Sequence, residues 1–485
     1  MNAQQFTDIF LDSFPYEPTT DQHSLVEKLS DFILAPQVDA LFVLKGYAGT
    51  GKTTVVSNLV NVLPTLKAHS VLLAPTGRAA KVISSYSGKP AYTIHRKIYR
   101  LTGDADGNFA FKLLPNKHVN TLFIVDEASM IGNQNLSEES SLFGTGNLLN
   151  DLISYVYSGE NCRLILIGDT AQLPPVGSTE SPALNIPYLK SLFHFKIWSA
   201  QLRDVVRQEA DSGILHNATL VRSRLQNGED SPGFIKFSLK NFRDIRRAQG
   251  TETMDYINDA FSSRNFGETI VVCRSNKRAN LYNTHIRQRV LFKEEEISAG
   301  DLLMIVKNNY FWLPEQSAAG FIANGDIAEV RRIQRIEELY GFRFAHVTIK
   351  LIDYPDQEEL DVIIFLDTLS IDGPAFTYQQ TAKLFEEISQ DYLDEPLKSK
   401  RLSKIKKNPY LNALQVKFAY ALTCHKAQGG QWQNVFVEMG YIPSEKPDTE
   451  YYRWLYTALT RATKNLYLMG FSDDFFVEEK SGNTI

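Results

Sequence analysis

The chain has 485 residues, of which 43% are hydrophobic and 22% charged, the ordinary composition of a globular protein. This length exceeds what one compact core usually supports, so we expect about three domains. No apolar run reaches the roughly 18 residues that a membrane-spanning helix needs, which argues against a membrane protein. Because the net charge is −5, any nucleic acid would have to bind in a local basic groove rather than on a generally basic surface.

The N-terminal segment and the cysteines indicate where the protein works. The first residues contain Asp8 and Asp12 and no early Lys or Arg, which argues against a secretory signal and favours a short packed helix. The three cysteines, Cys162, Cys273 and Cys424, form no CxxC pair, so neither a disulfide framework nor a zinc site is indicated. We expect a reducing, cytoplasmic environment.

Short apolar runs in the first half of the chain each end in small or polar residues. Such runs are typical of buried parallel strands in an α/β fold. In doubly wound sheets, ligands bind at the carboxyl ends of the strands. The runs span residues 40–46, 70–76, 121–129 and 162–169.

The first run leads into GYAGTGKTT, which matches the pattern G-x-x-x-x-G-K-[ST]. Backbone N–H groups of such a loop surround phosphates, Lys52 can reach the β- and γ-phosphates, and the Thr53 hydroxyl can ligate Mg²⁺. A glycine-rich turn that only needed positive φ would not require the Lys-Thr pair, so we predict an ATP site. Its loop residues are Gly46, Ala48, Gly49, Thr50, Gly51, Lys52, Thr53 and Thr54.

Two later strands also end in polar groups suited to phosphate chemistry. Asp126 and Glu127 follow the run LFIV, and one carboxylate can hold the Mg²⁺ shell while the other orients the attacking water. The segment GDTAQLPPVGS, residues 168–178, contains Gln172, whose amide can bond a γ-phosphate or its water. These groups predict hydrolysis as well as binding of the nucleotide.

Taken together, the motifs resemble those of superfamily 1 helicases, within the RecD-like and Dda-like branch that moves 5′ to 3′ on single-stranded DNA. The resemblance covers nearly the whole chain, and the motifs follow the family's order. They are GYAGTGKTT (46–54), APTGRAAK (74–81), YTIHR (92–96), VDEAS (125–129), GDTAQLPPVG (168–177), VVRQ (205–208), ALTCHKAQGGQW (421–432) and YTALTRAT (456–463).

The resemblance implies two RecA-like parallel-sheet domains with ATP in the cleft between them. It places Arg207 and Arg461 across that cleft as γ-phosphate contacts, with Arg461 as an arginine finger, and it makes Gln22 an adenine-reading residue. Tyr47 stands where relatives often have proline, and we expect this change to have little effect. The implied catalytic residues are Lys52, Asp126, Glu127, Gln172, Arg207 and Arg461.

DNA binding without sequence preference needs hydroxyls, backbone amides and a few cations near the phosphates. Residues of these types lie in the motifs that line the family's DNA groove. A single histidine in such a place is more often structural, and only its position within a motif favours DNA contact here. The implied DNA-binding residues are Thr76, Gly77, Arg78, Thr93, His95, Thr423, His425, Lys426 and Gln428.

Two insertions complete the implied architecture. An Asp-Gly turn followed by NFAFK predicts a hairpin, where Phe109 or Phe111 either wedges the strands apart or only packs on its own domain. Alternating residues in 342–354 and 360–369 predict antiparallel strands, and this region resembles the SH3-like domain that the family carries here. The implied parts are domain 1A (1–96 and 118–190), hairpin 1B (97–117), domain 2A (191–329 and 411–485) and the SH3-like domain 2B (330–410).

We therefore expect an ATP-dependent DNA helicase that translocates 5′ to 3′, uses ATP and Mg²⁺, and binds single-stranded DNA and its junctions with duplex. The direction comes wholly from the resemblance. Two alternatives stay open: a translocase that remodels complexes without strong unwinding, and a protein whose binding is regulated by nucleotide. We expect a monomer. DNA repair and recombination are roles suggested by the resemblance, but the motifs do not encode the pathway.

Overall fold

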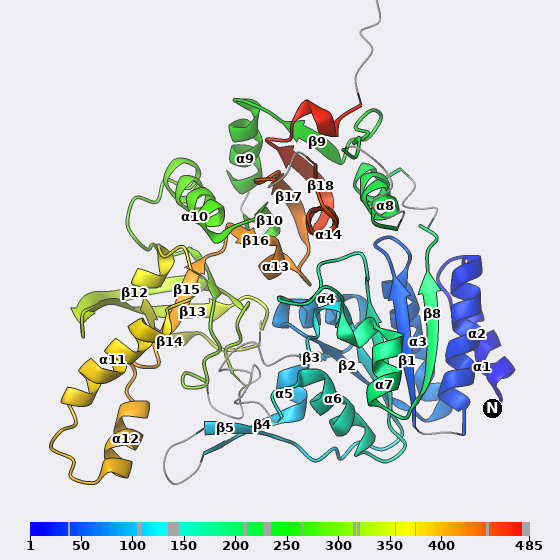
Figure 1. Cartoon of the computed structure of the whole chain (residues 1–485), viewed down its shortest axis with the longest axis horizontal. Coiled ribbons are helices and arrows are strands. Elements are labelled where there is room, and N and C mark those ends of the chain that lie inside the picture. Colours follow the sequence, from blue (N-terminus) through cyan, green and yellow to red (C-terminus); the bar gives the residue numbers. More distant parts are fainter. Residues whose placement is uncertain are drawn as a thin grey trace, which may run out of the picture.

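The computed structural model shows a chain built on two parallel sheets and a closed barrel (Figure 1). In Figure 1 the first sheet lies at the lower right, the second sheet above it, and the barrel at the lower left. The predicted α/β fold with two P-loop-type sheets and a small β-rich insertion is confirmed. The structure describes residues 1–36, 39–103, 109–133, 145–206, 211–226, 234–262, 266–313, 317, 321–354, 356–373, 375–442 and 446–477.

The first sheet has six parallel strands in the order β3-β2-β6-β7-β1-β8. All four predicted strands of the first half belong to it, and β1, β6 and β7 are almost entirely buried, as apolar runs require. The strands are β1 (Ala40–Gly46), β2 (His69–Ala74), β3 (Ala91–Thr93), β6 (Thr121–Val125), β7 (Arg163–Gly168) and β8 (Lys196–Leu202).

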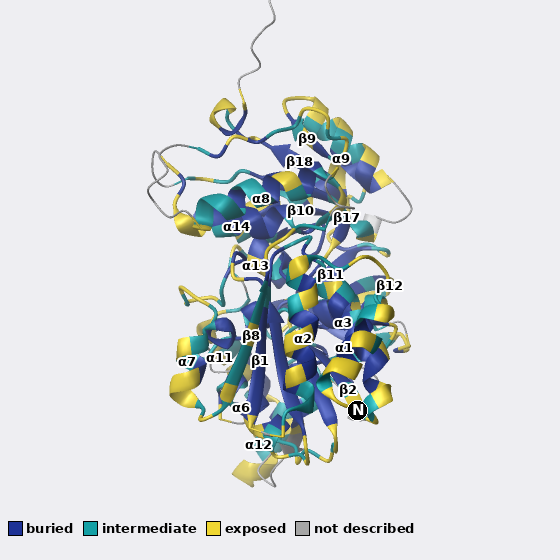
Figure 2. Cartoon of the chain, turned by 90° about the vertical axis from the view of Figure 1, so that its right-hand side faces the viewer, coloured by how far each residue is buried: buried dark blue, intermediate teal, exposed yellow. Residues whose placement is uncertain are grey.

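Helices cover both faces of this sheet, because alternate strand residues point to opposite sides. Phe42 packs with Phe6 and Leu25 on one face, whereas Val43 packs with Leu149 on the other. Figure 2 shows the buried strand β1 running through the middle of the domain. The helices are α1 (Ala3–Asp12), α2 (Thr20–Leu34), α3 (Lys52–Val62), α4 (Gly77–Ser87), α5 (Ile94–Ile98), α6 (Leu148–Tyr157) and α7 (Ile186–Leu192).

The second sheet has five strands in the order β16-β10-β17-β18-β9, and all its pairs are parallel. Its strands are β9 (Ile245–Ala248), β10 (Thr269–Cys273), β16 (Ala421–Thr423), β17 (Trp432–Glu438) and β18 (Ala462–Met469). Its helices are α8 (Gly213–Gln226), α9 (Glu252–Ser262), α10 (Asn276–His285), α13 (Cys424–Ala427) and α14 (Thr449–Leu459).

The barrel closes through five strands, and one continuous apolar core joins it to the second sheet. Two helices, α11 (Tyr378–Gln390) and α12 (Lys398–Lys406), pack on a smaller aromatic cluster beside it. The barrel strands are β11 (Leu302–Ile305), β12 (Ile327–Leu339), β13 (Phe342–Leu351), β14 (Leu360–Phe365) and β15 (Leu414–Phe418).

Two of the expected domain boundaries differ from the strand pairing. Strand β8 pairs with β1 over seven residues, so the first sheet extends past residue 190. Strands β11 and β15 pair with each other and close the barrel, although both lie outside 330–410. Strand β11 is short and apolar, whereas β8 and β15 mix apolar residues with lysine and glutamine. Nothing local in the sequence says which sheet each of them joins.

A hairpin leaves the first domain after α5. Strands β4 (Tyr99–Gly103) and β5 (Phe109–Leu113) pair antiparallel, which agrees with the hairpin expected there. The side chains of Phe109 and Phe111 lie outside the described part of the structure, so the wedge stays a prediction. Among the described helices, none is long and apolar enough to cross a membrane.

Candidate active site

The phosphate loop connects β1 to α3 and is closed by the side chain of its own lysine. Gly51 precedes the helix with φ of 79°, a conformation that glycine adopts without strain. The Lys52 ammonium donates to the carbonyl oxygens of Gly46 and Tyr47, both at 2.7 Å. The predicted loop therefore has the expected strand-to-helix position, with Lys52 folded back over it.

Gln22 lies directly against this loop. It is buried in the first turn of α2, where its Oε1 accepts from the backbone N–H of Thr19 at 3.0 Å. Its Nε2 donates to the Thr50 carbonyl at 3.1 Å, and a Cβ on Gly51 would lie 2.3 Å from that nitrogen. One end of the Gln22 amide therefore caps α2 and the other braces the loop, and the adenine-reading role of Gln22 stays a prediction.

The two predicted carboxylates follow β6 and face the same loop. Asp126 accepts from the Tyr86 hydroxyl at 2.8 Å through one oxygen and from the Glu127 N–H at 2.8 Å through the other. Glu127 has a φ of 52°, which turns its side chain out of the strand direction. Burial raises the pKa of Glu127, and the Arg461 guanidinium opposes that rise.

Arg461 reaches this carboxylate from the second domain. It is buried at the end of α14, where Nη1 donates to the Gly430 carbonyl at 3.1 Å and Nε donates to the Thr457 carbonyl at 3.0 Å. Its Nη1 lies 3.9 Å from Glu127 Oε1. These bonds hold a fixed cation on the opposite side of the cleft, the position expected of an arginine finger.

The loop after β7 is held by groups from the second domain. Gln172 is buried there, as part of the wall of the cleft. The next residue, Leu173, donates its N–H to Thr457 Oγ1 at 2.8 Å and accepts from Gln428 Nε2 at 2.9 Å. Gln428 thus fixes the loop in this structure, and its expected contact with DNA stays a prediction.

A cavity of about 420 Å³ opens among these groups and draws its walls from both sheets. Thr53 and Asp126, the expected Mg²⁺ ligands, line it together, and their oxygens are the donor type that Mg²⁺ prefers. Arg207 lies outside the described residues. The walls include Ala48, Gly49, Lys52, Thr53, Tyr86, Asp126, Glu127, Gln172, Gly429, Thr460 and Arg461.

One tyrosine at the cleft, Tyr456, was given no role by the sequence. The hydroxyl of Tyr456 accepts from the Ala48 N–H at 2.9 Å and donates to Asp169 at 2.6 Å. Although Tyr456 begins a recognised motif, nothing in the motif indicates these partners.

Tyr47 is buried, and the expectation that it has little effect overlooks its contacts. Its hydroxyl receives hydrogen bonds from Gln201 Nε2 at 3.1 Å and Gln226 Nε2 at 2.7 Å. The Arg222 guanidinium lies 4.5 Å above its ring. Since Gln226 and Arg222 belong to α8, Tyr47 joins the phosphate loop to the second domain, which proline could not do.

The expected DNA-binding residues of the first domain lie at the start of α4 and α5. Thr76 caps α4 by accepting from the Ala79 N–H at 3.2 Å, and the Arg78 guanidinium lies 4.0 Å above the Trp432 ring. A Cβ on Gly77 would lie 2.6 Å from Asp326 Oδ1, so the barrel covers Gly77 in this structure.

The histidine and hydroxyl expected at α5 have structural partners. Thr93 caps α5 by accepting from the Arg96 N–H at 3.3 Å. The His95 ring lies 5.8 Å from the Tyr99 ring, and burial lowers the pKa of His95 to about 4. His95 is therefore neutral near pH 7 and could meet a phosphate only through a neutral hydrogen bond.

The last group of expected DNA contacts surrounds α13 in the second domain. Thr423 precedes this helix, and His425 and Lys426 lie in it. Burial lowers the pKa of Lys426 to about 8, with a smaller contribution from nearby Lys417. Lys426 therefore stays mostly protonated at neutral pH and can offer a cation to a phosphate.

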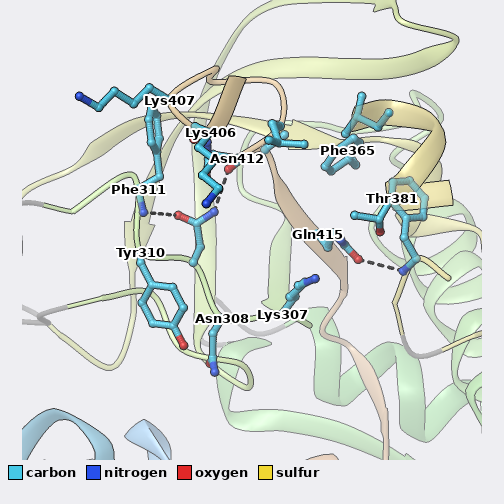
Figure 3. A pocket seen from close by; sticks show the side chains of 15 residues that line it. Lys307, Asn308, Tyr310, Phe311, Phe365, Thr381, Lys406, Lys407, Asn412 and Gln415 are labelled. Atoms are coloured by element: carbon cyan, nitrogen blue, oxygen red, sulfur yellow. Dashed lines mark hydrogen bonds between the residues drawn. The ribbon is translucent and has the colours of Figure 1, made fainter. Parts of the chain in front are cut away.

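A separate cavity of about 480 Å³ lies between the barrel and the helices α11 and α12 (Figure 3). Its wall is fixed by Asn309, whose Nδ2 donates to the Asn412 carbonyl at 2.8 Å, and by Gln415, whose Oε1 accepts from the Phe376 N–H at 2.9 Å. None of the predicted site residues lines it. The expected chemistry therefore belongs to the cleft between the sheets.

Two family models match parts of this chain. Residues 19–231 match the family described as AAA domain, and residues 418–469 match the family described as UvrD-like helicase C-terminal domain. The two matches contain the phosphate loop and the Lys426 segment with Arg461, respectively. A solved Pif1 helicase from Bacteroides covers 93% of this chain, and this chain covers 94% of it, at 14% identity and a TM-score of 0.44.

Three curated relatives are similar in sequence. An uncharacterized protein of Acanthamoeba polyphaga mimivirus is 24% identical over 93% of this chain and 99% of its own length. The ATP-dependent DNA helicase dda of Enterobacteria phage T4 is 27% identical over 54% of this chain and 55% of its own length. The ATP-dependent RecD2 DNA helicase of Deinococcus radiodurans is 35% identical over 28% of this chain and 16% of its own length.

The cleft geometry and these matches lead to the same assignment. A phosphate loop in one parallel sheet faces an arginine from a second one, and the matched families cover both halves of that cleft. The chain belongs to the superfamily 1 helicases, within the group that includes Dda and RecD.

Proposed function

We propose that this protein is an ATP-dependent DNA helicase that translocates 5′ to 3′ on single-stranded DNA and separates duplex strands. The observation that carries the proposal is the approach of Arg461 to Glu127 across the cleft, at 3.9 Å. A protein that only bound nucleotide would not need a hydrolytic carboxylate and a cation from a second domain at one point.

ATP is proposed to bind with its phosphates on the loop between β1 and α3. Lys52 would leave the carbonyl oxygens that it now contacts and turn to the β- and γ-phosphates. Glu127 would orient the attacking water, and Gln172 would bond that water or the γ-phosphate. Thr53 and Asp126 would hold Mg²⁺, which neutralises phosphate charge when bound.

Hydrolysis is expected to depend on the relative position of the two sheets. Arg461 stabilises charge on the transferring phosphoryl group only when the cleft is closed, since it is fixed to the second domain by three hydrogen bonds. Nucleotide binding, closure and hydrolysis are thereby linked, and this link is what moves one domain relative to the other along a strand.

Single-stranded DNA is the proposed partner, and the starts of α4, α5 and α13 are its proposed contact points. These segments supply hydroxyls, amides and a few cations, which hold phosphates without reading bases. The direction of translocation is inferred from the similarity to Dda and RecD2. In the described structure Asp326 and Tyr354 cover Gly77, so a contact between Gly77 and DNA requires the barrel to move.

The test of this proposal is ATPase activity with and without single-stranded DNA, with Lys52→Ala as the inactive control. We expect DNA to stimulate hydrolysis at least tenfold in the wild type and the variant to bind DNA without turnover. Hydrolysis that DNA does not stimulate would contradict the proposal. Stimulated hydrolysis without strand separation would assign the protein as a translocase.

A further inference from the structure

Tyr456 connects three parts of the cleft through one hydroxyl group. It lies in α14 of the second domain and is fully buried. Its oxygen accepts from the Ala48 N–H of the phosphate loop at 2.9 Å, and its hydrogen is donated to Asp169 Oδ2 at 2.6 Å. The contact with Ala48 joins residues 408 positions apart in the sequence.

Both oxygens of the Asp169 carboxylate accept a hydrogen bond in this arrangement. Asp169 is buried at the end of β7, and its Oδ1 accepts from the Ala171 N–H at 2.9 Å. Burial raises the pKa of Asp169, whereas Lys52, the Tyr456 hydroxyl, Ala171 and Arg461 lower it, in that order. The Tyr456 hydrogen bond therefore helps to keep this carboxylate charged in a buried place.

The residue after Tyr456 also ties α14 to the loop that carries Gln172. Thr457 accepts from the Leu173 N–H at 2.8 Å, so α14 holds the loop around Gln172 at both Asp169 and Leu173. Arg461 follows directly after the C-cap residue of the same helix, Thr460. Movement of α14 would shift the phosphate loop, the Gln172 loop and Arg461 together.

We propose that Tyr456 is a positioning residue for ATP hydrolysis, which aligns the phosphate loop at Ala48 and the Gln172 loop at Asp169 with the helix that leads to Arg461. This inference rests on the proposed ATPase function. Tyr456 acts through these neighbours, and its own oxygen is already engaged by Ala48 and Asp169.

The test compares Tyr456→Phe with Tyr451→Phe in the full chain. Tyr451 is an equally buried tyrosine of α14, and its hydroxyl donates to the Met439 carbonyl at 3.1 Å, outside the cleft. For Tyr456→Phe we expect a fall of about tenfold in the kcat of DNA-stimulated hydrolysis. This loss is much smaller than the rate acceleration that an enzyme supplies as a whole. We expect the KM for ATP to change less than threefold, and Tyr451→Phe to match the wild type.

The pH profile of kcat separates positioning from a merely structural role. Without the hydroxyl, Asp169 loses a donor that stabilises its charged form, so its pKa rises further. The acidic limb of the profile should therefore move to higher pH in Tyr456→Phe. A variant that is only less stable would lose activity in proportion to its folded fraction, with the limb unmoved.

Asp169→Asn provides a second test that does not depend on one variant. If the hydroxyl acts through Asp169, the double variant Tyr456→Phe/Asp169→Asn should be no slower than the slower single variant. Additive losses, an unmoved acidic limb, or a Tyr456→Phe enzyme like Tyr451→Phe would each overturn the inference. A wild type without DNA-stimulated hydrolysis would instead overturn the proposed function.

Discussion

Arg461 Nη1 lies 3.9 Å from Glu127 Oε1, on opposite sides of the cleft between the two parallel sheets. The arginine is held by backbone carbonyls of its own domain, so its position reports the position of that domain. Glu127 belongs to the sheet that carries the phosphate loop. We therefore propose that domain closure and hydrolysis depend on this one pair of side chains.

Arg461→Lys keeps a positive charge but removes the planar set of donors. We expect ATP affinity within about threefold of wild type, because the loop binds the phosphates from the other side. Hydrolysis should fall by about 10³-fold or more, the usual effect of losing an arginine finger. Binding of a fluorescent ATP analogue and steady-state ATPase rates measure the two effects, with thermal unfolding as the check on folding. Near-normal turnover would disprove the assignment.

Glu127→Gln preserves the shape of the side chain and removes its ability to take a proton from water. Turnover should fall by about 10²- to 10⁴-fold while single-stranded DNA binding is retained. Fluorescence anisotropy with a labelled oligonucleotide, run beside the ATPase assay, measures both. A variant that still hydrolyses ATP at more than a tenth of the wild-type rate would remove Glu127 from its proposed role.

Tyr47 offers a graded test of the link between the phosphate loop and α8. Tyr47→Phe removes the acceptor for Gln201 and Gln226, at a cost of about 1 kcal/mol per hydrogen bond. Tyr47→Ala also removes the ring beneath Arg222, so we expect it to lower the melting temperature further. Equal melting temperatures for both variants and the wild type would show that these contacts contribute nothing.

Asp326 predicts a pH dependence of stability. Burial raises the pKa of Asp326 to about 8, the Ala323 N–H lowers it, and the Asp353 carboxylate raises it. An unfolded aspartate titrates near 4, so from about pH 4 to pH 8 the folded state holds a proton that the unfolded state has lost. The contribution of Asp326 to stability is greatest below pH 4 and is lost as pH rises through this window.

Asp326→Asn should therefore become progressively more stable than the wild type as pH rises, by up to about 1.4 kcal/mol per pH unit between pH 4 and 8. Thermal unfolding at several pH values measures the difference. Asp356→Asn, a change at an exposed carboxylate of the same region, is the control and should show no such trend. A constant difference between variant and wild type would contradict the assigned protonation.

The sequence predicted the parts of the site that depend on local patterns. A phosphate loop requires glycines, a lysine and a hydroxyl in fixed order, so the sequence motif alone identified the loop that ends in Thr53. Asp126 and Glu127 were likewise identified by the apolar strand before them. The four predicted strands lie in one sheet because buried parallel strands have continuous apolar runs.

The contacts that join distant segments could not be predicted in this way. The bond between Tyr456 and Ala48 depends on how α14 rests on the loop, and no spacing in the sequence records it. Gln428 illustrates the opposite case, since its motif suggested DNA whereas its amide holds Leu173. The edges of the barrel were misplaced because β11 and β15 meet only after folding.

Strand separation on two partial duplexes that differ only in carrying a 5′ or a 3′ single-stranded tail tests the helicase function most directly. We predict ATP-dependent unwinding of the 5′-tailed duplex alone, with no unwinding by Lys52→Ala. Unwinding only from the 3′ tail would contradict the direction inferred from Dda and RecD2, and unwinding of neither substrate would contradict the helicase function itself.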